Sequence, residues 1–272
     1  MAKEYRVLEK RRIMGFTPYD WNENVQHRVD YVENRLRQGS PVVGRVFDGG
    51  VLILSVRKSQ RKVFEVFDHI LFSAMGSQQD VEAIRLFSID FAHQEGFTRS
   101  PDDVSVQRLL AGSLSPTLKK AFGDGFSAPF IFRGLYAELG RDASRDRFTT
   151  LNYDGEYAVY PLFAAIAGSS NAEQRMRESL EAHDAAAPSL PEAVRYALEA
   201  WAAGQAAARS SRPLTGRVRN EPEEEEETTP QSALEHALKE GQIEVGLIER
   251  HGKESRFRLL GEDEMARIRR EA

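Results

Sequence analysis

The sequence predicts an α+β sandwich, and three observations lead to that class. Apolar strand patterns come first, over residues 42–76, and strand patterns return in the middle and near the end of the chain. The helical patterns come in two pairs, over residues 77–118 and 169–208. This order differs from the alternation of single strands and helices that builds a parallel sheet. A chain of 272 residues with 41% hydrophobic content is long enough to form one such domain around a sizeable core.

The N-terminal region divides into a tail and a helix. Residues 1–15 are polar and basic without a clear period, so we expect a mobile tail ahead of a single domain spanning 16–272. Residues 21–38 carry one apolar stripe at spacings of four, three and four, formed by Val25, Val29, Val32 and Leu36. This pattern is typical of an amphipathic helix, and Gly39 follows it where a C-terminal cap is expected.

Hairpins and a first helix pair follow. Asp48-Gly49-Gly50 supplies a tight turn between two apolar strands, and residues 62–76 contain two more strands. Ser77 and Ser100 each precede an acid at the third following position, as expected at helix starts. The predicted buried stripes are Val81, Ile84, Phe87 and Phe91 in the first helix and Val106, Leu110, Leu114 and Leu118 in the second. Pro116 should kink or split the second helix.

The second half repeats these signals. Strand patterns occupy 129–140, 147–160 and 163–168, with a hairpin turn at Asp154-Gly155. Helices are predicted over 169–183 and 189–208, the latter with a Ser189–Glu192 capping box and Pro191 in its first turn.

An acidic, Pro-rich insert and a closing unit end the chain. Residues 209–231 lose all periodicity and contain five consecutive acids, Glu223–Glu227, so we expect a disordered insert. A specific acidic docking site is the less favoured interpretation of that insert. A last hairpin and a helix are predicted from residue 242 onward.

Composition argues against several functional classes. A net charge of −5 gives no reason to expect nucleic acid or an anionic membrane as a partner, and no apolar run is long enough to span a bilayer. The chain has no cysteine, and its six histidines do not fall at metal-ligand spacing. Gly123-Asp124-Gly125 lacks the context of a phosphate-binding loop. We therefore expect no metal and no cofactor, and a cytoplasmic protein.

Several segments, taken in order, resemble the α-type subunits of the proteasome core particle. They are "FTPYD…HRVDYVENRLRQGSPVVG" (16–44), "FDGGVLILS" (47–55), "RKVFEVFDHILFSAMGSQQD" (61–80) and "QIEVGLIERHGKESRFRLLGEDEMARI" (242–268). The short loop before Lys62 and the acidic insert resemble bacterial, actinobacterial-type members. The Tyr-Asp-Arg triplet that archaeal members carry before the Phe-x-Pro turn has no counterpart in residues 1–15.

The resemblance implies a four-layer αββα sandwich of the N-terminal-nucleophile hydrolase type, in a non-catalytic version with an N-terminal helix. It implies a homo-heptameric α ring that caps proteolytic β-type subunits and admits unfolded protein substrates through a gated pore. C-terminal tails of a ring-shaped AAA ATPase or another activator would bind a pocket containing Lys62, Gly76 and Asp30. Phe16 and Pro18 would form the turn that controls the gate.

Ser40 is the residue on which an alternative function depends. In catalytic relatives a Gly–Thr or Gly–Ser bond is cut before such a hairpin, and the freed terminal residue attacks the substrate with help from an acid and a lysine. Lys62 stands where that lysine would be, but the position expected to carry the acid reads Ser55-Val56-Arg57, a cation with no carboxylate beside it. We therefore favour the scaffold over the catalyst. A self-processing hydrolase using Ser40 and Lys62, and an assembly scaffold unrelated to proteolysis, remain the alternatives.

Overall fold

The computed structural model describes residues 18–183, 187–210, 229–251 and 256–271. Within these ranges the strands form two five-stranded antiparallel sheets. The first sheet has the order β10-β9-β2-β1-β8 and consists of β10 (Phe257–Leu259), β9 (Gln242–Glu249), β2 (Gly50–Arg57), β1 (Val42–Phe47) and β8 (Phe163–Ile166). The second has the order β3-β4-β5-β6-β7 and consists of β3 (Val63–Phe67), β4 (Ile70–Gly76), β5 (Phe132–Glu138), β6 (Arg147–Asn152) and β7 (Tyr157–Tyr160).

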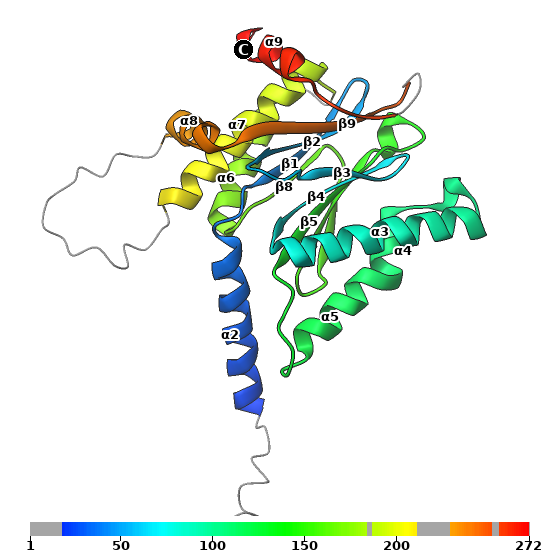
Figure 1. Ribbon diagram of the computed structural model, residues 1–272, viewed down its shortest axis with the longest axis vertical. Coiled ribbons are helices and arrows are strands. Elements are labelled where there is room, and N and C mark those ends of the chain that lie inside the picture. Colours follow the sequence, from blue (N-terminus) through cyan, green and yellow to red (C-terminus); the bar gives the residue numbers. More distant parts are fainter. Residues whose placement is uncertain (1–17, 184–186, 211–228, 252–255, 272) are drawn as a thin grey trace, which may run out of the picture.

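Helices surround the two sheets. They are α2 (Pro18–Leu36), α3 (Gln78–Thr98), α4 (Val106–Leu109), α5 (Ser115–Gly123), α6 (Ser170–Glu181), α7 (Leu190–Ser210), α8 (Pro230–Glu240) and α9 (Glu262–Glu271). In Figure 1, α3 to α5 lie on one side of the paired sheets and α6 to α8 on the other. The layers therefore follow the expected order of helix, sheet, sheet, helix.

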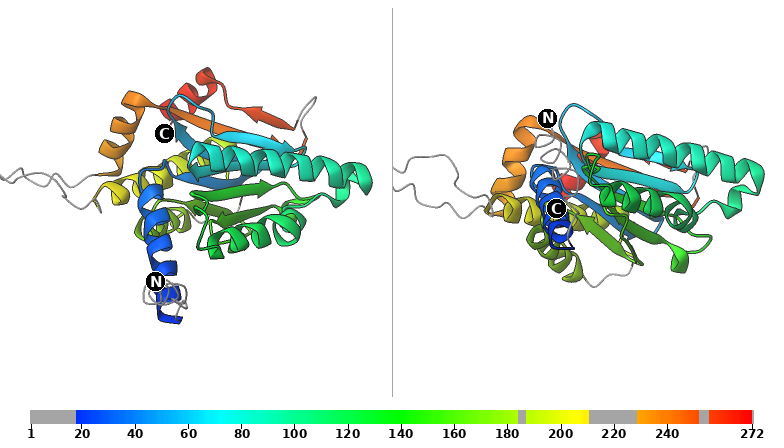
Figure 2. Two further views of the ribbon diagram at one scale, coloured as in Figure 1. Left: turned by 60° about the horizontal axis from the view of Figure 1, so that its bottom comes forward. Right: turned by 90° about the horizontal axis from the view of Figure 1, so that it is seen from below.

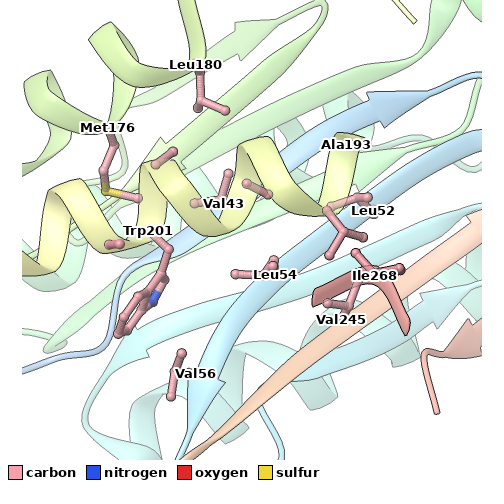
Figure 3. Close-up of a cluster of buried hydrophobic side chains, with 14 of the residues drawn as sticks. Val43, Leu52, Leu54, Val56, Met176, Leu180, Ala193, Trp201, Val245 and Ile268 are labelled. Carbon is pink, nitrogen blue, oxygen red and sulfur yellow. The ribbon is translucent and has the colours of Figure 1, made fainter. Parts of the chain in front are cut away.

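Three apolar clusters hold these layers together. The central cluster lies between the sheets and includes Val51 and Ile53 from the first and Leu135 from the second. A second cluster packs the first sheet on α6 and α7, where Figure 3 shows Trp201 of α7 pointing toward the strands and Met176 of α6 lying against α7. The third packs the second sheet on α3 and on the helical segments that follow α3. Burial of this much apolar surface is the main driving force for the fold.

The helix α2 is joined to the body over its C-terminal half, beginning at Arg28, which donates to the carbonyl oxygens of Ala121 and Ser127. Val32 and Leu36 are buried in the central cluster, whereas Trp21 and Tyr31 are exposed. Figure 1 and the left view of Figure 2 show the helix extending away from the paired sheets. The amide of Gly39 donates to the Leu36 carbonyl oxygen at 2.8 Å, which closes the helix at the predicted glycine.

Two predictions for the first helix pair are wrong in detail. Phe87 is 42% exposed and stacks on Phe91, because the inward face of α3 is formed by Ile84, Ser88 and Ala92. Ser88 fits this face because its hydroxyl bonds to the hydroxyl of Tyr136 at 2.9 Å, and a polar residue of this kind escapes an apolar pattern.

The second helix of this pair begins later than predicted and is divided. Ser100 caps a 3₁₀ turn, Pro101–Asp103, and Ser105 is the N-cap of α4. A π turn, Leu110–Leu114, then separates α4 from α5, in whose first turn Pro116 lies. The predicted split is therefore confirmed, and the stripe from Val106 to Leu118 is buried as predicted.

The boundaries of the acidic insert also differ from the prediction. Arg209 and Ser210 are the last residues of α7, and α8 begins at Pro230 behind the N-cap Thr229. The predicted disordered segment thus loses both of its ends to helices, and α8 itself was missed. Glu223–Glu227 lie outside the described residues.

Candidate functional site

A cleft of about 500 Å³ opens beside the C-terminal end of α2. Its walls come from residues 37–40, the β2–β3 connection, the β4–α3 junction, and the facing surfaces of α7 and α8. Lys62 and Gly76 both line this cleft, so the structure brings together two of the three residues predicted for one pocket.

Gly76 is at the last position of β4 because no other residue fits there. Its φ is +137°, and a Cβ atom would lie 2.0 Å from the carbonyl oxygen of Ile131. Ser77 follows as the N-cap of α3 and accepts a hydrogen bond from the amide of Asp80 at 3.4 Å. The glycine therefore lets β4 turn directly into α3 at the edge of the cleft.

Lys62 is the last residue of the connection from β2 to β3. The residue is half-buried, and its ammonium donates a hydrogen bond to the carbonyl oxygen of Ser40 at 2.9 Å. Burial lowers the pKa of Lys62 from 10.5 to about 8, and the nearby carboxylate of Glu244 opposes part of that shift. Lys58, on the same connection, is exposed and pairs with Glu240 at 2.9 Å. The two lysines of this connection therefore differ in their electrostatic environment.

Glu244 is the residue that sequence reasoning missed. It lies on β9, its side chain is only 5% exposed, and its carboxylate accepts hydrogen bonds from the amides of Lys62 and Val63. It also pairs with the guanidinium of Arg57 at 3.0 Å. The expectation that Arg57 has no carboxylate beside it is therefore wrong. The signal in the sequence is a single acid inside the apolar run "QIEVGLI".

Ser40 lies where the alternative function would need it, but its bonding is structural. Its hydroxyl oxygen is 3.4 Å from that of Ser55 and accepts from the indole of Trp201 at 3.3 Å. Ser55 and Trp201 both donate to the carbonyl oxygen of Pro41, at 2.7 and 3.0 Å. Lys62 contacts the Ser40 carbonyl oxygen, so the sequence correctly placed the serine and the lysine side by side.

The other predicted residues lie away from the cleft. Asp30 is exposed on α2, about two turns before Arg37, and accepts a hydrogen bond from Gln26 at 3.0 Å. Within one chain it does not join Lys62 and Gly76. Pro18 is the first residue of α2, while Phe16 and the tail 1–15 lie outside the described residues.

No group of three or more His, Cys, Asp or Glu side chains in the described parts of the chain is arranged to hold a metal ion. No helix among those residues combines the length and apolar character needed to cross a membrane.

The structure has paired antiparallel sheets between helical layers, and Ser40 and Lys62 lie together beside the start of β1. These features define a sandwich of the N-terminal-nucleophile hydrolase type. The family model described as Proteasome subunit matches residues 36–212. The chain therefore belongs to the proteasome subunit family.

The relatives identify the branch of that family. The chain is 26% identical to proteasome subunit alpha of Thermobifida fusca over 250 residues, which cover 91% of this chain and 88% of that protein. It is 30% identical to the subunit alpha of a Nocardioides species over 176 residues, covering 64% of this chain and 68% of that protein. With the subunit alpha of Jonesia denitrificans it shares 35% identity over 133 residues, which cover 48% of this chain and 56% of that protein. These findings place the chain with the bacterial α-type subunits, as its sequence predicted.

Proposed function

We propose that this chain is a non-catalytic subunit of the α ring of a proteasome core particle, acting in the cytoplasm. Seven copies would form a ring that caps rings of β-type subunits and admits unfolded protein chains to them. The names of its relatives support this assignment, and so does the domain itself, in which α2 is packed into the core.

The cleft beside α2 is the proposed docking site for the C-terminal tails of a ring-shaped AAA ATPase or another activator. The observation that carries this proposal is the Lys62 ammonium, which lies in a cleft large enough for a peptide end and is held by a neutral carbonyl group. A terminal carboxylate there would form a charge-assisted hydrogen bond worth roughly 1.5–3 kcal/mol.

The proposed gate uses the other end of α2. Residues 1–15 would converge at the pore, and the turn containing Phe16 and Pro18 would set whether they block it. Residues 37–40, at the base of α2, line the cleft, so an occupant of the cleft contacts the segment that leads to the gate. A coupling of about 1–3 kcal/mol at each site, repeated around a symmetric ring, is enough to shift such an equilibrium.

The alternative is a self-processing hydrolase with Ser40 as the nucleophile. The contact between Ser40 and Lys62 is the observation in its favour. Against it, cutting at Gly39 would remove a helix whose Val32 and Leu36 are 0% and 1% exposed in the central cluster. Loss of that much buried apolar surface would cost several kcal/mol, on the order of 1.5–3 for each side chain.

The test is to purify the chain, measure its intact mass and N-terminus, and mix it with the β-type subunit of the same organism. We expect an uncut chain that forms a large barrel with the β-type subunit and makes its peptidase activity respond to a ring ATPase. A Lys62→Met ring that still responds fully to the ATPase would refute the docking site. A chain cut before Ser40 with its own peptidase activity would establish the hydrolase instead, and a ring that never binds β-type subunits would indicate an unrelated scaffold.

A further inference from the structure

We propose that Glu244 is the positioning residue of the Lys62 cleft. Its carboxylate fixes the peptide segment that carries Lys62 and supplies a nearby negative charge without occupying the lysine ammonium. This inference rests on the proposed docking role of the cleft.

Glu244 binds the main chain at the start of β3. One carboxylate oxygen of Glu244 accepts from the amides of Val63 at 2.9 Å and Lys62 at 3.2 Å, and the other lies 3.4 Å from the same Lys62 amide. Two successive amides are thus bound by one buried carboxylate, which fixes where β3 begins. The position of Lys62 follows directly, because it is the residue immediately before that strand.

Glu244 also links the two sheets. Glu244 lies on β9 in the first sheet, where it pairs with Ser55, whereas Val63 begins β3 in the second sheet. The carboxylate therefore connects the sheets at the cleft. No periodic pattern in the sequence signals such a contact, because the bonded residues are 181 and 182 positions apart.

The charge of Glu244 is balanced within the same chain. A buried carboxylate needs compensation. Arg57 provides it at 3.0 Å, with Arg61 at 3.9 Å. These two arginines balance Glu244, so the carboxylate does not depend on the Lys62 ammonium for its own stability. Its charge still favours the protonated lysine and opposes the effect of burial on the lysine pKa.

The arrangement has a consequence for binding. A salt bridge between the Lys62 ammonium and a carboxylate of the same chain would compete with an incoming chain end. Here the contacts from Lys62 to Glu244 come from the backbone amide, while the ammonium points to the Ser40 carbonyl oxygen. The ammonium therefore keeps its charge and remains able to bond to a terminal carboxylate.

The test compares Glu244→Gln with Glu235→Gln in the full chain. Both changes remove one negative charge, but Glu235 is exposed on α8, accepts a hydrogen bond from Gln231 and is not among the residues that line the cleft. Lysines are labelled by reductive ¹³C-methylation, and the Lys62 signal is identified by its loss in Lys62→Arg. We expect Glu244→Gln to move the titration midpoint of Lys62 to lower pH by about half a unit or more, and Glu235→Gln to leave it unchanged.

A second variant separates charge from position. Glu244→Asp keeps the charge on a shorter side chain, so we expect its Lys62 midpoint to remain closer to that of the unmodified protein. Hydrogen exchange at the Lys62 and Val63 amides should become faster in Glu244→Asp, because the shorter carboxylate no longer reaches both groups. Glu244→Asp also serves if Glu244→Gln does not fold. An unchanged Lys62 midpoint in Glu244→Gln, or unchanged amide exchange in Glu244→Asp, would overturn the inference.

Binding is then measured with a peptide that carries the C-terminal sequence of the organism's ring ATPase, and with its amidated twin. At pH 7.5 we expect Glu244→Gln to weaken binding of the free-carboxylate peptide at least about threefold, with Glu235→Gln close to the unmodified protein. Equal binding of both peptides to the unmodified chain would contradict the proposed docking function. A shifted Lys62 midpoint with unweakened carboxylate binding would contradict the positioning role alone.

Discussion

Lys62 donates its ammonium hydrogen bond to the main-chain carbonyl oxygen of Ser40 across 2.9 Å. The serine hydroxyl instead contacts Ser55 and the indole of Trp201. In this arrangement the lysine ammonium does not bond to the serine hydroxyl. It stabilises a peptide group in the connection between α2 and β1. In an uncut chain, Ser40 and Lys62 stabilise the connection between α2 and β1. In a cut chain, the same two residues would take part in catalysis.

The first prediction is that the bond between Gly39 and Ser40 survives in the mature protein. Cutting this bond would detach α2, whose Val32 and Leu36 are buried in the central cluster, and exposing them would cost free energy. Intact mass spectrometry of the assembled ring should give the uncut chain. A fragment that begins at Ser40 would contradict this reading.

The second prediction concerns the anchoring of α2. Leu36→Ala should lower the free energy of unfolding by about 2–4 kcal/mol, because Leu36 is buried in the central cluster and its truncation leaves a cavity. Asn34→Ala, two residues earlier on the exposed side of the helix, is the control and should change stability by less than about 0.5 kcal/mol. Chemical denaturation of the two variants provides the comparison, and equal stabilities would mean that α2 is not part of the core.

The third prediction is a gain in stability from removing the charge of Lys62. Folding lowers the pKa of this lysine from 10.5 to about 8, so burying the ammonium costs free energy at pH 7. Lys62→Met should raise the free energy of unfolding by roughly 1–2 kcal/mol at pH 7, after allowance for the lost hydrogen bond.

The way in which the stability changes with pH follows from the direction of the Lys62 pKa shift. Between pH 8 and 10.5 the unfolded chain holds one more proton at Lys62 than the folded chain, so the contribution of Lys62 to stability rises with pH across that window. The advantage of Lys62→Met should therefore be complete below pH 8 and shrink toward pH 10.5. A variant less stable than the unmodified protein at pH 7 would refute the argument.

The fourth prediction is the pH dependence of docking. The lysine loses its positive charge as the pH rises through about 8, so affinity for a free C-terminal carboxylate should fall across that range. Fluorescence anisotropy with a tail peptide between pH 6.5 and 9.5 measures the midpoint. Lys62→Arg is the control, because arginine stays charged throughout, and its binding should be flat over the same range.

The fifth prediction concerns Gly76. Gly76→Ala should lower the free energy of unfolding by about 2–4 kcal/mol, because its backbone is in a region that L-residues rarely adopt and a Cβ would collide with the Ile131 carbonyl oxygen. Gly112→Ala is the matched control, since a Cβ there meets nothing within 4 Å. Thermal unfolding of both variants decides the matter, and similar losses at the two positions would argue against the strain at Gly76.

Periodic patterns predicted most of the layers, because each element buries one face. The stripe at Val106, Leu110, Leu114 and Leu118 is a case in which spacing alone identified the buried positions. The same logic failed at Phe87, since Ser88 takes the inward position by bonding to Tyr136. It also missed α8, whose start signals, Thr229 and Pro230, directly follow a strongly acidic run.

The site was predictable only in part, for a similar reason. Lys62, Gly76 and Ser40 could be placed together from an ordered set of short segments that resemble a known family. Glu244 could not, because the amides that it binds lie at the start of β3, a strand of the other sheet, 181 and 182 positions earlier in the chain. Contacts between sheets depend on packing geometry, which a local pattern does not contain.

The shape of α2 has a mechanical consequence. Its 19 residues form a rod about 28 Å long. The rod is anchored over its C-terminal half, where Arg28 donates to the carbonyl oxygens of Ala121 and Ser127, and its N-terminal half extends from the body in Figure 1. The held end forms part of the cleft wall. The ten residues of α2 before Arg28 span about 15 Å at 1.5 Å per residue, so a tilt of about 10° at Arg28 would displace Pro18 by about 3 Å.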